Sequence, residues 1–195
     1  AVRFPKHKLL RNLLKNLDYP LAAPSANISS RLSSVKPSDV KEEFGSKIKY
    51  ILNGGKSKIG VESTILNLLE KPSLLRYGGL DTKKIENVLK KKLLININSK
   101  KKLSPGLFPL HYSPGIPLRV NVKKPKKDEA YLLIKKRKSK LKNYYYLSKV
   151  KNLKEAAKNL YSTLRKIKND GFKKIAVEKI PVSYTHLTLP TIDPV

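Results

Sequence analysis

The chain has 195 residues, no cysteine and a formal net charge of +29 at pH 7. Without cysteine there is no disulfide framework, thiol nucleophile or cysteine metal site, and three scattered histidines predict no zinc site. No apolar run is long enough to cross a bilayer, so we expect a cytoplasmic protein without a membrane partner. The charge favours polyanionic partners such as tRNA or nucleotides, or else it reflects lysines spread over solvated helix faces.

The first half of the chain predicts short helices and strands joined by polar turns. Leucines recur at helical spacing over residues 8–17, which indicates an amphipathic helix. A second helix is expected over residues 38–44, with Ser38 as cap and Gly45 as stop, and a third after the cap Asp81. Apolar runs predict strands at residues 21–23, 50–52, 59–61, 63–68, 74–76 and 94–97. Two of these strands form a meander, so the sheet should be mixed rather than purely parallel.

The pattern changes near residue 99. Residues 99–117 are rich in Lys, Pro, Gly and Ser, which is typical of a linker. Strands are then expected at residues 131–134, 144–147 and 174–178. Between the last two, Asn152 and Glu155 form a candidate capping box for a helix that Gly171 ends. This order predicts a small doubly wound domain with a parallel strand pair and a right-handed crossover.

Two hydroxyl-rich segments stand out at predicted strand ends. They are Pro24-Ser25-Ala26-Asn27-Ile28-Ser29-Ser30 and Gly60-Val61-Glu62-Ser63-Thr64. Small hydroxyl and amide side chains leave room for a phosphate or carboxylate to approach the backbone. A single turn of this kind is more often an ordinary loop that satisfies its own backbone.

The order of several motifs makes the pattern specific. Besides these two segments, the chain carries Val2-Arg3-Phe4-Pro5, Leu75-Arg76-Tyr77-Gly78-Gly79, Ser104-Pro105-Gly106 and His111-Tyr112-Ser113-Pro114-Gly115. Together they resemble the YrdC-like threonylcarbamoyl-AMP synthases in their long, two-domain form, over residues 1 to about 181. The resemblance implies an α/β fold. It comprises the C-terminal part of a twisted mixed-sheet catalytic domain (1–98), a linker strap (99–117) and a small Rossmann-like α/β domain (118–181). Residues 182–195 are interpreted as a non-native tail outside this fold.

The resemblance also implies a reaction and its partners. L-threonine, bicarbonate and ATP give threonylcarbamoyl-AMP and pyrophosphate, which makes the enzyme a nucleotidyltransferase. The product feeds the threonylcarbamoyladenosine modification of tRNA adenosine 37 through a separate transferase, so tRNA and that transferase are further candidate partners. Mg²⁺ is expected with ATP as substrate, and no carboxylate cage for it is visible in the sequence. Catalysis would consist of positioning and charge stabilisation at phosphorus.

The family's site residues carry over by position. ATP binding is expected at Ser25, Ser33, Arg76 and Tyr112. Threonine binding is expected at Arg3, Ala23 and Ser63, with Arg3 pairing the substrate carboxylate. Ser25 and Asn27 are the candidate catalytic pair. Each also has an ordinary structural interpretation, such as a strand-end arginine, a solvent-facing serine or a docked aromatic. Glu62 is the one acidic residue inside these motifs, and we do not expect it to bind metal.

One departure from the family matters. Its Lys-x-Arg pair and first substrate-binding residues would lie before Ala1, so we expect this polypeptide to be inactive alone. Residues 182–195 break the Lys-rich composition and resemble a translated sequencing adapter. Two other functions remain open. They are a non-catalytic RNA-binding module of the same fold and the carbamoyl-transfer domain of hydrogenase-maturation proteins. The linker followed by a β-α-β domain argues against the second.

Overall fold

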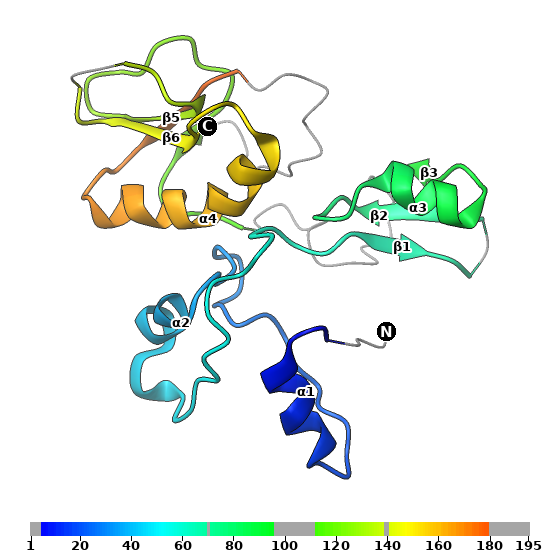
Figure 1. The fold of residues 1–195 in the computed structure, drawn as a ribbon. Coiled ribbons are helices and arrows are strands. Elements are labelled where there is room, and N and C mark those ends of the chain that lie inside the picture. Colours follow the sequence, from blue (N-terminus) through cyan, green and yellow to red (C-terminus); the bar gives the residue numbers. More distant parts are fainter. Residues whose placement is uncertain (1–4, 70, 96–111, 139–140, 180–195) are drawn as a thin grey trace.

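The computed structural model describes residues 5–69, 71–95, 112–138 and 141–179. They form two small sheets and four α-helices (Figure 1). The α-helices are α1 (Lys8–Lys15), α2 (Pro37–Phe44), α3 (Thr82–Leu89) and α4 (Leu153–Asn169), and a 3₁₀ turn, η1 (Gly45–Lys47), follows α2. The strands are β1 (Ile65–Asn67), β2 (Ser73–Arg76), β3 (Leu94–Ile95), β4 (Leu118–Arg119), β5 (Ala130–Lys135), β6 (Tyr144–Ser148) and β7 (Ile175–Val177).

The first sheet is mixed, as the sequence predicts. Its order is β1-β2-β3, with β1 and β2 antiparallel and β2 and β3 parallel. The predicted meander is therefore confirmed. Asp81 caps α3 as expected, because its carboxylate accepts a hydrogen bond from the backbone N–H of Lys83 at 2.9 Å.

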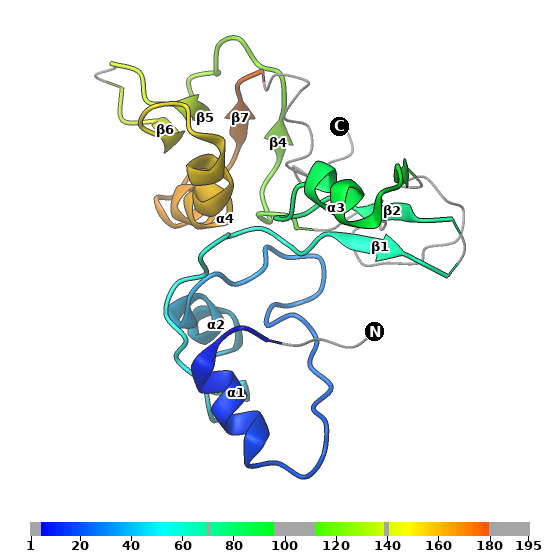
Figure 2. The same ribbon diagram turned by 45° about the vertical axis from the view of Figure 1, so that its right-hand side comes forward.

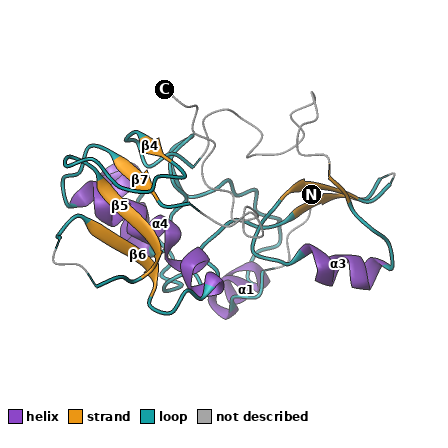
Figure 3. Cartoon of the chain, turned by 90° about the horizontal axis from the view of Figure 1, so that it is seen from above, coloured by secondary structure: helices purple, strands orange, loops and turns teal. Residues whose placement is uncertain are grey.

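The second sheet has the order β4-β7-β5-β6, and every pair in it is parallel (Figure 3). Strand β5 is buried along almost its whole length, as expected for a parallel strand covered on both faces. Helix α4 packs on this sheet through apolar side chains at helical spacing. The buried residues of α4 are Ala156, Ala157, Leu160, Tyr161, Leu164 and Ile167. The predicted parallel β-α-β arrangement is confirmed.

Some predicted elements are absent or shifted. Residues 21–23, 50–52 and 59–61 form no strand, and several of their apolar side chains are exposed. A strand needs a hydrogen-bonded neighbour, and the described residues place none beside these runs. Ser38 is not the cap of α2, which begins at Pro37 because Pro is well suited to a first helical position. Gly45 does end α2, at φ +54°.

The capping box at α4 is only half formed. The side chain of Asn152 accepts a hydrogen bond from the N–H of Glu155 at 3.1 Å, as predicted. The carboxylate of Glu155 instead accepts the hydroxyl proton of Ser148 at 2.6 Å, and the N–H of Asn152 donates to that same hydroxyl. Ser148, at the end of β6, therefore takes the place that the box assigns to Glu155. This joins the start of α4 to the strand before it.

Helix α4 also borders the first half of the chain (Figure 2). The backbone of Gly60 lies so close to it that a Cβ at Gly60 would sit 2.4 Å from the carbonyl oxygen of Lys158. Gly60 has φ +82°, a conformation that residues with a side chain rarely adopt. Glycine is thus required there on two grounds, and the segment leading to β1 is packed directly on α4.

Candidate functional site

Arg76 is the centre of the site. It ends β2, and antiparallel pairing with β1 brings it beside the residues that precede that strand. Its Nε donates a hydrogen bond to the carbonyl oxygen of Ser63 at 3.0 Å, and its Nη2 lies 3.8 Å from Oε2 of Glu62. Its Nη1 donates to the phenol oxygen of Tyr112 at 2.9 Å. One guanidinium therefore joins three points of the chain.

Glu62 extends this cluster to the loop that follows the first hydroxyl-rich segment. The hydroxyl of Ser33 donates a short hydrogen bond to Oε1 of Glu62, while Oε2 faces Arg76. The order of contacts is Ser33, Glu62, Arg76 and Tyr112. Glu62 is the residue whose role the sequence interpretation missed. Its place inside the segment Gly60-Val61-Glu62-Ser63-Thr64 was the available signal.

Tyr112 is held from several sides. The residue is 5 % exposed, and its ring stacks on that of Tyr161 in α4, with centroids 5.9 Å apart and planes at 23°. Burial raises the pKa of Tyr112, and the charge of Glu62 adds to this against the opposing effect of Arg76. The phenol therefore stays protonated at neutral pH. As a neutral phenol it accepts the hydrogen bond from Arg76.

The backbone beside Tyr112 is docked on the first hydroxyl-rich segment. The N–H of Ser113 donates to the carbonyl oxygen of Ser30 at 2.8 Å, and Arg31 and Ser113 form a parallel bridge. Tyr112 itself has φ +60°. The described end of the linker, residues 112–117, thus lies across the loop that carries Ser33 and fixes the position of the tyrosine.

The remaining predicted residues are placed differently. Asn27 uses its amide inside its own loop, donating to the carbonyl oxygens of Ile28 at 2.9 Å and Arg31 at 3.2 Å. Its Oδ1 is buried and has no hydrogen-bond partner among the described residues. Ser25 and Ala23 are exposed, and no described hydrogen bond joins either of them to the Arg76 cluster. Arg3 lies outside the described residues. The structure therefore brings together Ser33, Ser63, Arg76 and Tyr112.

A wide hollow opens beside this cluster. Its volume is about 1540 Å³, and Ala26, Ser34, Glu62 and Ser63 are among the residues that line it. Apolar side chains of α3, including Ile85, form part of its wall. Ligand sites typically combine such apolar walls with a few polar groups that orient the ligand.

The described residues meet neither the requirements of a metal site nor those of a membrane-spanning helix. The described residues contain no group of three or more His, Cys, Asp or Glu side chains placed to hold a metal ion. Glu62 is engaged with Ser33 and Arg76 instead. Among the described helices, none has the length and apolar character needed to cross a bilayer.

Fold and site together define an α/β protein whose polar site lies where a mixed sheet, residues 112–117 and helix α4 meet. Residues 1–78 match the family described as "Telomere recombination", and residues 80–189 match "Threonylcarbamoyl-AMP synthase, C-terminal domain". The chain belongs to the threonylcarbamoyl-AMP synthase family. The second match runs to residue 189, past residue 182, where the sequence interpretation placed the start of a tail.

Two curated relatives carry the name "Threonylcarbamoyl-AMP synthase". The protein of Pyrococcus abyssi is 39 % identical over 122 residues, which are 59 % of this chain and 35 % of the relative. That of Bacillus subtilis is 37 % identical over 124 residues, which are 62 % of this chain and 36 % of the relative. The chain therefore spans about a third of the length of these relatives.

Two solved structures share the fold. The crystal structure of P. abyssi Sua5 complexed with L-threonine matches with a TM-score of 0.79 and 29 % identity, over 95 % of this chain and 61 % of that one. A variant of the same protein, with neighbouring His and Tyr changed to Ala, matches with a TM-score of 0.78 over 95 % of this chain and 59 % of that one. The expected α/β fold is confirmed by these matches.

Proposed function

We propose that the protein containing these residues is an L-threonylcarbamoyladenylate synthase. The amino nitrogen of threonine takes up CO₂ from bicarbonate to form a carbamate. A carbamate oxygen then attacks the α-phosphorus of ATP, the bond from that phosphorus to the bridging oxygen breaks, and pyrophosphate leaves. The protein is thus a nucleotidyltransferase of the cytoplasm, and its product serves the threonylcarbamoyladenosine modification of tRNA.

One observation carries this proposal. The contacts Ser33–Glu62, Glu62–Arg76 and Arg76–Tyr112 unite three segments distant in sequence around one arginine. An arginine flanked by hydroxyl groups suits a polyphosphate, which needs positive charge and many hydrogen-bond donors. We therefore assign Ser33, Arg76 and Tyr112 to ATP.

The threonine subsite is assigned to the neighbouring edge of the hollow. Ser63 lines that hollow directly beside the Arg76 cluster, and Ala23, Ser25, Asn27 and Arg3 belong to the same proposed site by their positions in the family pattern. The L-threonine in the crystal structure of the P. abyssi relative supports this choice of amino acid. In that view Ser25 faces the reacting phosphate, and Asn27 takes part by holding the loop that carries Ser25. Arg3 and the backbone of Ala23 hold threonine.

The strap is proposed as a cover over the nucleotide. Tyr112 is buried between Arg76 and Tyr161, so it can anchor the strap without exposing an apolar ring. A closed strap would keep water from a reactive acyl adenylate. The chain has a single His-Tyr pair, His111-Tyr112, and one of the matching P. abyssi structures is of a variant in which an adjacent His and Tyr are changed to Ala.

Magnesium is proposed to enter as part of the substrate, bound to ATP. The described residues offer no cluster of acidic or histidine ligands that would hold the ion by itself. In the polyphosphate complex the ion would lower the charge that Arg76 must offset. No role is assigned to Glu62 as a metal ligand.

The proposal is tested by pyrophosphate release from the full-length protein. Release should require both threonine and bicarbonate, and Arg76→Ala or Ser33→Ala should lower it by about a hundredfold, the usual loss when one preorganised donor is removed. Arg137→Ala is the matched control, because that arginine pairs with Glu178 in the C-terminal domain. Release that ignores threonine, or that survives both changes, would contradict the assignment. Absence of turnover with tight, salt-dependent RNA binding would favour the RNA-binding module.

A further inference from the structure

The loop that carries Ser33 is held from outside at three points. Oε1 of Glu43 accepts a hydrogen bond from the N–H of Ile28 at 2.8 Å, at the start of the segment 28–36. Oδ2 of Asp39 accepts from the N–H of Val35 at 2.9 Å, near its end. Between these points, Nη2 of Arg165 donates to the carbonyl oxygen of Leu32, the residue before Ser33.

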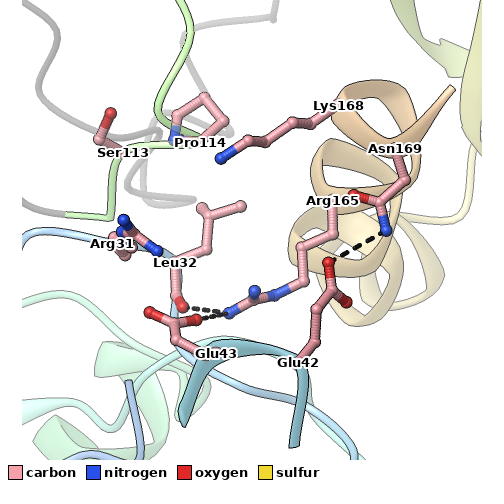
Figure 4. Close-up of a pocket in the computed structure, with 9 residues that line it drawn as sticks. All are labelled: Arg31, Leu32, Glu42, Glu43, Ser113, Pro114, Arg165, Lys168 and Asn169. Atoms are coloured by element: carbon pink, nitrogen blue, oxygen red, sulfur yellow. Dashed lines mark hydrogen bonds and ion pairs between the residues drawn. The ribbon is translucent and has the colours of Figure 1, made fainter. Parts of the chain in front are cut away.

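The three groups that hold the loop form one cluster, and Figure 4 shows its Arg165 together with Leu32 and Glu43. Nη2 of Arg165 also lies 3.0 Å from Oε2 of Glu43, and its Nε lies 3.9 Å from Oδ2 of Asp39. The side chains of Asp39, Glu43 and Arg165 are 4 %, 2 % and 16 % exposed. Because these charges are largely buried, removing one leaves the others without compensation.

Arg165 does not belong to the loop or to α2. It comes from α4, which packs on the parallel sheet of the C-terminal half. The same helix supplies Tyr161, which stacks on Tyr112, and Lys158, whose backbone meets Gly60. Helix α4 therefore touches the three segments that meet around Arg76. Arg165 is the group through which it reaches the loop of Ser33.

We propose that Arg165 is a positioning residue, which holds the segment 28–36 in the conformation that presents Ser33 to Glu62. The C-terminal domain thereby sets how well the loop is ordered. The effect of Arg165 on ATP binding rests on the proposed function. The effect of Arg165 on the order of the loop does not, because backbone order can be measured without turnover.

The experiment compares Arg165→Ala, Arg165→Lys and Arg137→Ala in the full-length protein. Hydrogen exchange of the segment 28–36 and trypsin cleavage after the exposed Arg31 report loop order. Arg165→Ala should speed both by about tenfold or more, since local opening loses a charged hydrogen bond, while β5 and β7 keep wild-type exchange. Arg165→Lys should restore part of the protection, and Arg137→Ala should match wild type.

Activity supplies the second readout. Arg165→Ala should raise the KM for ATP more than it lowers kcat, because the loop can still be ordered by bound nucleotide at a cost in affinity. If Arg165→Ala does not fold, Glu43→Gln asks the same question, since Glu43 holds the N–H of Ile28 and also pairs with Arg165.

The outcomes separate the two proposals. Wild-type exchange in the segment 28–36 of Arg165→Ala, or faster exchange spread evenly over the C-terminal sheet, would overturn the positioning role. Faster exchange confined to the loop of Arg165→Ala would support the positioning role. If the wild-type protein also shows no threonine-dependent turnover, the proposed function is wrong while the positioning role stands.

Discussion

Nη1 of Arg76 lies 2.9 Å from the phenol oxygen of Tyr112, so a residue at the end of β2 is tied directly to the strap that leads into the C-terminal domain. The first half of the chain and the linker thus share one polar contact at the proposed nucleotide site. Because Tyr112 is also stacked on Tyr161 of α4, the contact joins three parts of the molecule.

Tyr112→Phe should weaken ATP binding while leaving the fold intact. The change keeps the ring and its stacking but removes the oxygen that accepts from Arg76. A hydrogen bond to a charged group contributes about 1.5–3 kcal/mol, so the dissociation constant for ATP should rise by about tenfold or more. Tyr145→Phe is the control, because it removes a phenol that donates to Asp170, within the C-terminal half. An unchanged affinity in Tyr112→Phe would argue against a role for this contact.

Glu62→Gln should act mainly on kcat. Gln has nearly the same size but carries no charge, so Ser33 and Arg76 both lose the anion that orients them. Removing this negative charge also removes its repulsion of the polyphosphate, which offsets part of the ATP affinity that is lost when Ser33 and Arg76 are no longer oriented. We expect kcat to fall by about tenfold or more and the KM for ATP to change less, measured by pyrophosphate release. Glu178→Gln, which alters a carboxylate paired with Arg137, should behave as wild type.

Gly60→Ala should destabilise the packing on α4 more than Gly55→Ala does. Both glycines have positive φ, +82° and +73°, so both changes carry a similar backbone strain of about 1–2 kcal/mol. Only at Gly60 would the new Cβ meet the backbone of Lys158, whereas nothing lies within 4 Å of a Cβ at Gly55. Thermal unfolding of the two variants isolates the effect of the clash. Equal losses in Tm would show that the close approach to α4 is absent in solution.

Arg119→Ala should change how stability depends on pH. Glu129 is 2 % exposed, and Arg119 donates two hydrogen bonds of 2.8 Å to its carboxylate, which lowers the pKa of Glu129. A carboxylate with a lowered folded-state pKa stabilises the fold above its unfolded pKa of about 4.3, and this contribution is lost as the pH falls through the folded-state pKa. The Tm difference between wild type and Arg119→Ala should therefore be large at pH 7 and shrink below about pH 4. A difference independent of pH would contradict this account.

The elements that sequence predicts well are those whose signals are local. Asp81 caps α3, Gly45 ends α2, and the apolar spacing of α4 places Leu160 and Leu164 in the core. Each outcome depends on residues within a turn or two of one another. The apolar runs at 21–23 and 50–52 form no strand. Strand pairing depends on a neighbouring strand, which a few consecutive residues of sequence do not reveal.

The residues of the site also fall into those that the sequence predicts and those that it does not. Motif order pointed to Ser33, Ser63, Arg76 and Tyr112, and the structure brings them together. Glu62 was undervalued, because its role depends on Ser33 and Arg76 approaching it from two other segments. Arg165 carried no signal at all, since its partners lie more than a hundred residues earlier in the chain. Long-range ion pairs of this kind leave no spacing pattern behind.

The most direct test of the account is a double-mutant cycle on ATP affinity in the full-length protein, with Arg76→Ala, Tyr112→Phe and the two combined. If both residues hold the nucleotide through their mutual contact, the combined variant should bind ATP about as weakly as Arg76→Ala alone, with a coupling free energy of about 1 kcal/mol or more. If the fold-losses of ATP affinity in the two single variants multiply in the combined variant, the claim that strap and sheet form one nucleotide site is contradicted. An ATP affinity that neither change lowers would contradict it as well.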